Sequence, residues 1–142
     1  MVNIKHQLEI MAPAETVFVN LTTQNGLASW WTPDTNAKAE VSSILRFGFG
    51  PSYFKEMKVI ALEPDKKVEW KCIAGTEEWI GTTIEFIIQK DDKRTKVFFS
   101  HNNWESHTPM FSQCSYDWAM FLRSLKHLCE KEKGFPFPDQ HQ

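Results

Sequence analysis

The sequence lacks any long hydrophobic run. No stretch of its 142 residues approaches the roughly 18 consecutive apolar residues that a membrane-spanning helix needs. The first nine residues, Met1 to Glu9, contain no apolar core of the kind found in a signal peptide. We therefore expect a protein without a membrane span, located in the cytoplasm.

Cysteine is scarce, and the motifs of several kinds of site are missing. The three cysteines, Cys72, Cys114 and Cys129, form no Cys-x-x-Cys pair, which indicates reduced, buried thiols in a reducing compartment. None of the 5 histidines stands in a His-x-x-x-His spacing, and no glycine-rich phosphate loop or Gly-x-Ser-x-Gly turn is present. We expect no cofactor, no metal ligands and no catalytic residues.

Charge of one sign is not in excess. The 16 Lys and Arg against 18 Asp and Glu give a net charge of −2, and the basic residues are scattered along the chain. A nucleic acid or an anionic membrane surface is bound through a concentrated positive face. Neither is therefore expected as a partner.

Aromatic side chains, by contrast, are abundant. The chain has 11 Phe, 6 Trp and 2 Tyr in 142 residues. A chain of this length makes one domain and buries about 68% of the surface that it exposes when unfolded. So many tryptophans in one small domain indicate a wide interior lined by aromatic rings.

The longest amphipathic stretch runs from Thr108 to Gly134. Thr108 suits a helix N-cap, Pro109 the first helical position and Gly134 a helix stop. At 1.5 Å per residue, such a helix is roughly 37 Å long and crosses a small domain. Its apolar side chains recur with the spacing of one helix face, namely Cys114, Trp118, Phe121, Leu122, Leu125, Leu128 and Cys129.

Short segments of alternating hydrophobicity fill most of the remaining chain. A first strand starts near Ile4, and two short helices, 14–20 and 27–31, follow it with a turn between them. The later strands are joined by tight turns, as in an antiparallel meander, and we expect them at 43–49, 54–62, 67–73, 78–89 and 95–101. This order predicts an α+β fold, in which a curved antiparallel sheet wraps round the C-terminal helix and leaves a cavity between them.

Four segments resemble those of a known family, in matching order. They are Ala12–Phe18, Gly26–Trp31, Gly81–Phe86 and Thr95–His101. Together they resemble the START-like, helix-grip (SRPBCC, Bet v allergen-like) superfamily. Within it, they resemble the AHSA-like family, named for activators of heat-shock-protein ATPase, in its stand-alone bacterial form. The resemblance implies a helix-grip fold with a curved sheet of six to seven antiparallel strands and two short helices after the first strand.

The expected organisation is a single START-like domain over residues 1–142. Its core covers about 4–134, and the tail 135–142 is expected to lie loosely on the surface or to fray. The superfamily holds sterol and lipid carriers, hormone receptors and polyketide cyclases on one scaffold. The resemblance is therefore more specific for the fold than for the function.

A cavity between sheet and helix is the first candidate site. Pockets for small molecules are mostly apolar with a few convergent polar groups. The alternative is that the same side chains close-pack into an ordinary core. The predicted ligand-binding residues come from the inward faces of the strands and the helix, with two tryptophans near the mouth, and are Trp30, Trp31, Phe47, Phe49, Trp70, Ile84, Phe86, Phe99, His101, Trp104, Met110, Trp118, Phe121 and Leu122.

His101 is the candidate polar group of this cavity, together with Trp104. A neutral imidazole there would orient a ligand or act as a general base; alternatively, it is a core histidine that is hydrogen-bonded within the protein. Cyclase-type members of the superfamily use a charged side chain inside the cavity, a part that Asp117 or Arg46 would take here. The thiols are expected to be inert, because apolar burial raises the pKa of a cysteine.

Three functions remain open on this basis. The leading one is non-enzymatic binding of a small apolar or amphipathic ligand in the cavity. The second is a protein-interaction module similar to a chaperone ATPase activator, with an exposed hydrophobic patch made by Trp30, Trp31 and the Phe135–Phe137 tail. The third is a cyclase or hydrolase, which needs at least two inward polar groups with perturbed pKa values.

Overall fold

The computed structural model describes the whole chain, residues 1–142. Its strands form one 7-stranded antiparallel sheet in the spatial order β1-β7-β6-β5-β4-β3-β2. The predicted α+β class is confirmed, with two short helices after the first strand and a long helix at the C-terminus. The elements are β1 Val2–Ile10, α1 Ala14–Thr22, α2 Gln24–Trp30, β2 Thr35–Asn36, β3 Ile44–Gly48, β4 Phe54–Glu63, β5 Lys67–Ala74, β6 Thr83–Asp91, β7 Arg94–Trp104 and α3 Pro109–Lys131.

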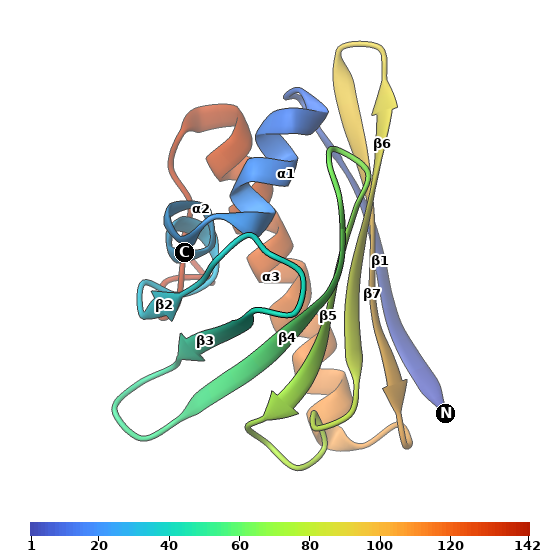
Figure 1. Cartoon of the computed structure of the whole chain (residues 1–142), viewed down its shortest axis with the longest axis vertical. Coiled ribbons are helices and arrows are strands. Elements are labelled where there is room, and N and C mark those ends of the chain that lie inside the picture. The colour runs from blue at the N-terminus through green and yellow to red at the C-terminus, as the bar shows by residue number, and fades with distance from the viewer.

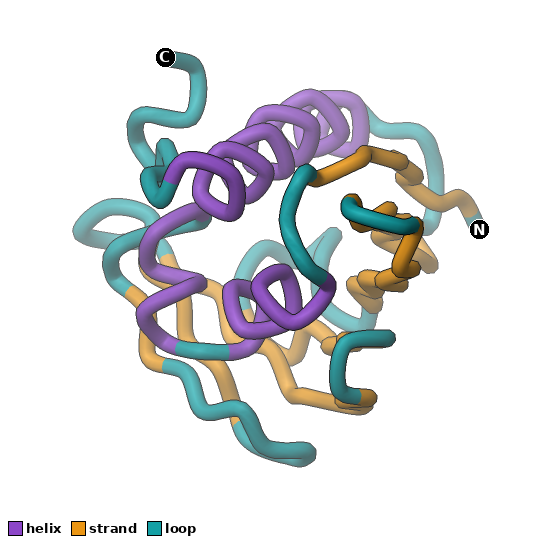
Figure 2. The backbone as a smooth tube through the Cα atoms, turned by 90° about the horizontal axis from the view of Figure 1, so that it is seen from above, coloured by secondary structure: helices purple, strands orange, loops and turns teal.

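The sheet is a meander whose last strand returns to the first. From β2 to β7, each strand pairs with its successor in the chain, and β7 then pairs with β1 from Ile4↔His101 to Ile10↔Thr95. The strands bend along one side of the molecule, and the helices cover the concave side (Figure 1, Figure 2). This arrangement is the helix-grip fold that the sequence predicts.

The long helix α3 begins as predicted and ends slightly earlier. Its N-cap Thr108 accepts a hydrogen bond from the Phe111 amide at 3.1 Å, and Pro109 occupies the first turn. The helix stops after Lys131, where Glu132 adopts a left-handed conformation with φ 62°. Gly134, the predicted stop, lies further along and packs so closely on the Ser29 carbonyl that a Cβ would overlap it. The glycine therefore permits a close approach instead of ending the helix.

The two short helices follow each other almost directly, where the sequence predicts an intervening turn. Thr23 is the residue between them, and its side chain caps α2 by accepting a hydrogen bond from the Gly26 amide at 3.1 Å. Gly26 also lies against the Asn20 backbone, with no room for a Cβ. This close crossing brings α2 inward and turns both of its terminal tryptophans toward the core.

The segment before β6 differs from the predicted strand 78–89. The strand begins at Thr83, and the preceding residues form a turn in which the Trp79 amide donates to the Thr76 carbonyl at 2.9 Å. Gly81, with φ 90°, ends the turn in a conformation that favours glycine. Trp79 is consequently only 3% exposed and packs against Trp118 of α3, with ring centroids 6.1 Å apart.

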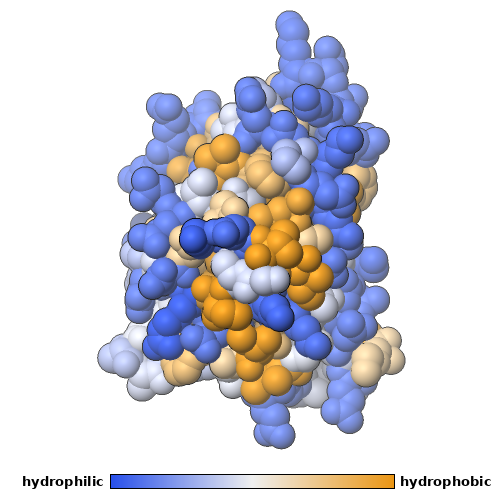
Figure 3. All heavy atoms as spheres, in the orientation of Figure 1, coloured by the Kyte–Doolittle hydropathy of each residue, from blue (hydrophilic) through white to orange (hydrophobic).

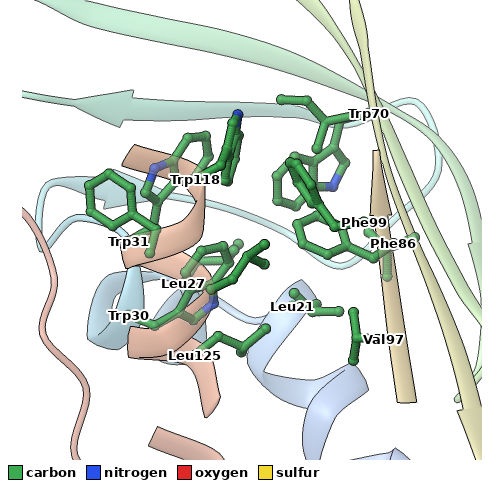
Figure 4. Close-up of a cluster of buried hydrophobic side chains, with 14 of the residues drawn as sticks. Leu21, Leu27, Trp30, Trp31, Trp70, Phe86, Val97, Phe99, Trp118 and Leu125 are labelled. Atoms are coloured by element: carbon green, nitrogen blue, oxygen red, sulfur yellow. The ribbon is translucent and has the colours of Figure 1, made fainter. Parts of the chain in front are cut away.

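One hydrophobic core of 27 buried residues lies between the concave face of the sheet and the helices (Figure 4). Trp30 and Trp31 belong to it, with 0% and 2% of their surface exposed. The Trp30 indole donates to the Asn20 carbonyl at 2.8 Å, and its ring stacks on that of Trp31 at 5.9 Å. The prediction that these two tryptophans contribute to an exposed patch is therefore wrong.

Candidate ligand-binding site

A pocket of about 250 Å³ lies where α3, the β3–β4 turn, the loop before β6 and the C-terminal tail meet. Of its 11 lining residues, 8 are hydrophobic. Three further residues, a lysine, an aspartate and a glutamine, contribute polar atoms. The lining residues are Trp31, Phe49, Tyr53, Lys55, Trp79, Cys114, Asp117, Trp118, Phe121, Phe137 and Gln140.

Tryptophans from three separate elements form the walls. The ring of Trp118, on α3, lies 5.1 Å from that of Trp31 at the end of α2 and 6.1 Å from that of Trp79, with interplanar angles of 33° and 26°. Trp31 also stacks on Trp70 of β5 at 5.9 Å, which ties the wall to the core behind it (Figure 4). Aromatic pairs at such separations stabilise each other beyond their area burial. The walls are consequently held in place without a ligand.

The C-terminal tail closes one side of the pocket. The Phe137 amide donates to the Trp31 carbonyl at 2.7 Å, and the Phe137 ring meets Phe49 edge-on at 5.4 Å. Arg123 of α3 donates to the Gln140 carbonyl at 3.2 Å. The tail 135–142, expected to lie loosely, is thus packed, because its Phe137 ring finds a partner in the loop after β3, its Phe137 amide at the end of α2 and its Gln140 carbonyl on α3.

Lys55 reaches the pocket from the inner face of β4. It lies two and four residues before Met57 and Val59, which are 0% and 2% exposed. Since every second residue of a strand faces the same way, the three side chains share the concave side of the sheet. Its Nζ lies 3.7 Å from the centroid of the Trp79 ring and 4.6 Å from that of Phe49. Burial in this aromatic surrounding is the main cause that lowers the pKa of Lys55 to about 8.

His101 lies behind the pocket wall, fully buried. Its Nδ1 accepts a hydrogen bond from the Trp118 indole at 3.1 Å, and its Nε2 bonds the Thr82 hydroxyl at 2.8 Å. An indole nitrogen can only donate, so the ring is neutral with its proton on Nε2, and it donates to Thr82. Burial, aided by the charge of Lys55, lowers the pKa of His101 to about 3. Both ring nitrogens are used inside the protein, and none faces the pocket.

The remaining charged and thiol candidates divide between pocket and surface. Asp117 lines the pocket and pairs with His141 at 3.5 Å, whereas Arg46 is exposed on the opposite sheet face beside Glu56. Cys114 also lines the pocket, and burial raises the pKa of its thiol. For Cys129, burial raises the pKa to about 11, the direction expected of an inert thiol.

The pocket brings together only part of the predicted ligand-binding set. Trp31, Phe49, Trp118 and Phe121 line it. Met110 is partly buried against the core, away from the pocket lining. The other members are buried in the packed interior, with at most 3% exposed, and are Trp30, Phe47, Trp70, Ile84, Phe86, Phe99, His101, Trp104 and Leu122.

Several lining residues escape the sequence analysis. Lys55 had a readable signal, because it continues the inward alternation of Met57 and Val59. Trp79 lies in a turn, and Phe137 and Gln140 lie in the tail, where no periodic pattern reports which way a side chain faces. Their positions depend on tertiary contacts alone.

Comparison with known proteins agrees with this geometry. The family model described as "Activator of Hsp90 ATPase homolog 1-like protein" matches residues 11–130. A search of curated proteins found no match. None of the helices is both long and apolar enough to cross a membrane.

Solved structures share the fold over nearly the whole chain. The Aha1 dimer from Colwellia psychrerythraea is 40% identical, with a TM-score of 0.86, over 94% of this chain and 100% of that one. Protein MLL2253 from Mesorhizobium loti is 15% identical, with a TM-score of 0.80, over 89% and 96% of the two chains. Protein SSP2350 from Staphylococcus saprophyticus is 13% identical, with a TM-score of 0.78, over 94% and 95%.

The last two similarities concern the fold alone, because their sequence identity is low. The family model and the Colwellia structure go further, since each accounts for most of the chain. The protein belongs to the family of Activator of Hsp90 ATPase homolog 1-like proteins.

Proposed function

We propose that the protein binds a small amphipathic molecule in the pocket between α3, the sheet and the C-terminal tail. The observation that carries this proposal is the composition of the pocket. Aromatic rings surround it, while the ammonium of Lys55 has no hydrogen-bond acceptor in the protein and the Gln140 Oε1 is buried without a donor. Apolar walls with a few convergent polar groups are typical of small-molecule sites.

The size of the pocket narrows the ligand class. Its volume of about 250 Å³ lies just below the ~300–1,000 Å³ of drug-sized ligand sites. A compact molecule of one or two rings therefore suits it better than a sterol or a long-chain lipid. A cyclase or hydrolase is less favoured, since the ring nitrogens of His101 are both engaged inside the protein.

The free cysteines support the cytoplasmic location that we also propose.

Filling the pocket tests this function. Cys114 lies on α3 and lines the pocket, so Cys114→Phe places a ring in the space that a ligand would use. Cys114→Ser is the matched control at the same position with nearly the same volume. Ligands come from native mass spectrometry of the purified protein and from a thermal-shift screen of one- and two-ring aromatic compounds.

We expect wild type and Cys114→Ser to bind a screened compound with a shift that grows with its concentration. Cys114→Phe should show no such shift while unfolding as cooperatively as wild type. Equal binding by Cys114→Phe and wild type would place the ligand elsewhere. A wild type without any bound or stabilising compound would overturn the ligand-binding function.

A second candidate function is self-association, which the Colwellia structure favours because it is described as a dimer. Hydrophobic side chains gather near the middle of one face among hydrophilic ones (Figure 3). Val41, Ile44 and Ile60 are 53%, 46% and 41% exposed, and the Ser42 amide holds their segment on β4 by donating to the Val59 carbonyl at 2.9 Å. These residues replace the buried tryptophans as material for a protein contact.

Sedimentation equilibrium over a range of protein concentrations tests this candidate. Ile44→Glu with Ile60→Glu should keep the chain monomeric, and Met11→Glu, at an exposed apolar position away from β3 and β4, is the control. If wild type stays monomeric at all concentrations, or if the double variant dimerises like wild type, this surface is not a dimer contact.

A further inference from the structure

Lys55 carries an ammonium group that makes no hydrogen bond within the protein. It pairs with Phe47 in the β3–β4 ladder, and like Phe47 it faces the concave side of the sheet. A lysine on an inward strand face is uncommon, because a buried ammonium loses its hydration. No oxygen of the protein compensates Lys55 with a hydrogen bond or an ion pair. Aromatic faces lie against its charge, including that of Tyr53 at 5.2 Å.

Gln140 gives a second, independent indication at the same pocket. The side chain is buried with 9% exposed, and its Oε1 has no hydrogen-bond partner. The chain has only one other such atom, the indole nitrogen of Trp104, and that residue does not line the pocket. A terminal amide can turn to present either its oxygen or its NH₂ group. A cation without a hydrogen-bond acceptor, Lys55, and a buried amide oxygen without a donor, that of Gln140, thus line the same aromatic pocket.

The charges around Lys55 limit what this space can accept. Cys72 of β5 and Cys114 of α3 face it as neutral thiols, because burial raises the pKa of both. Burial likewise raises the pKa of Tyr53, and His101 on β7 is neutral. The one anion is Asp117 of α3, which also pairs with His141 and accepts a hydrogen bond from Gln113 at 3.3 Å. A single negative charge on a ligand matches Lys55, whereas a second would be repelled by Asp117.

We propose that the ligand is a planar aromatic monocarboxylate, whose carboxylate pairs with the Lys55 ammonium while its ring lies among Trp31, Trp79 and Trp118. This assignment rests on the proposed ligand-binding function and deepens it. The carboxylate supplies the acceptor that Lys55 lacks. It also accepts a hydrogen bond from Gln140 when that amide turns its NH₂ group to the place where Oε1 lies. Charge-assisted bonds of this kind are the stronger ones in a low-dielectric site.

The test compares two probes of the same shape, 2-naphthoic acid and its neutral amide, 2-naphthamide. Their dissociation constants are measured by isothermal titration calorimetry on wild type, Lys55→Met and Lys55→Arg. At pH 7, wild type should bind the acid about 10- to 100-fold more tightly than the amide, as one hydrogen bond to a charged group provides. Lys55→Met should lose that preference, and Lys55→Arg should keep part of it.

A pH series on wild type needs no variant. Lys55 loses its proton above about pH 8, so affinity for the acid should fall by up to tenfold per pH unit above that value, while affinity for the amide stays constant. Equal binding of both probes, or an unchanged preference in Lys55→Met, overturns the carboxylate assignment and leaves the pocket function standing. Binding of neither probe to wild type overturns the assignment, whereas the pocket function fails only if the wider screen with Cys114→Phe also fails.

Discussion

Two basic side chains, the buried His101 and the half-buried Lys55, contact the same tryptophan and are treated differently by the fold. The His101 ring meets Trp79 edge-on at 4.5 Å, and the Lys55 Nζ lies 3.7 Å from the centroid of the same ring. Both nitrogens of His101 are hydrogen-bonded, to Trp118 and Thr82. Lys55 has no such partner.

The difference separates a polar group that serves the fold from one that is available to a ligand. A buried polar group that is fully hydrogen-bonded adds to stability and specifies one packing arrangement. A buried charge without a partner costs free energy, and its retention indicates a use outside the fold, such as binding. The two residues therefore predict opposite responses to substitution and different responses to pH.

Removing the imidazole should give the largest effect. His101→Ala leaves the Trp118 indole without its acceptor and opens a cavity beside Trp79. Large-to-small changes in a core cost about 2–5 kcal/mol, and an unsatisfied buried donor costs about 1–3 kcal/mol. We expect the free energy of unfolding in urea to fall by roughly 4 kcal/mol.

His6→Ala is the matched control, because the His6 Nε2 contacts the Ser115 carbonyl at 3.1 Å but the side chain is only partly buried. For this variant, the free energy of unfolding should fall by no more than about 1 kcal/mol. If His101→Ala destabilises the protein no more than His6→Ala, the hydrogen bonds of His101 do not hold the core, and the contrast with Lys55 disappears.

The fold was predictable from the sequence because its signals are periodic. The spacing of Trp118, Phe121 and Leu125 marks one helix face, and all three are buried on α3. Strand alternation likewise indicates which side chains face inward. Neither pattern reports how far a side chain lies from the element opposite, and so neither separates a close-packed core from a pocket.

The predicted site shows this limit. Phe86 and Phe99 face inward as expected, but their rings lie 5.2 Å apart in the packed core. The pocket opens instead where a turn and the tail supply Trp79 and Phe137, segments whose direction is set by tertiary contacts. Lys55 was the detectable member, since a cation in register with Met57 and Val59 breaks an apolar inward row.

The pH dependence of stability gives a second test of His101. The pKa of His101 is about 3 in the folded protein, against the ordinary 6.5 that it has when unfolded. Between these values, the unfolded chain binds a proton that the folded protein does not. The stability that depends on a neutral His101 is therefore fully present above pH 6.5 and is lost as pH falls toward 3. At pH 4.5, the loss relative to pH 8 should be about 2–3 kcal/mol.

His101→Gln removes the titrating imidazole and with it this pH-dependent part of the free energy of unfolding. All other acid-sensitive groups stay in place. The measured quantity is the difference in the free energy of unfolding between wild type and His101→Gln, followed from pH 8 to pH 4.5. That difference should shrink as pH falls. A difference that is independent of pH would show that the imidazole protonates as easily inside the protein as outside it.

Substitution of Lys55 should give the smallest change in the free energy of unfolding, and this change should be a gain. Its pKa is about 8 in the folded protein and 10.5 by its ordinary value, so at pH 7 the folded state carries the cost of a buried charge, which disappears as pH rises from 8 to 10.5. Lys55→Met removes that cost together with cation–π contacts of about 0.5–2 kcal/mol. We expect a net gain of about 1 kcal/mol at pH 7, vanishing near pH 10, by urea unfolding at both pH values.

A variant that folds more tightly yet loses the preference for an acid over its amide would show that Lys55 is kept for binding at the expense of stability, a trade-off common at functional sites. A loss of stability comparable to that of His101→Ala would instead make Lys55 a structural residue. Its contacts with three aromatic rings would then stabilise the fold, and the contrast between Lys55 and His101 would not distinguish a binding group from a core group.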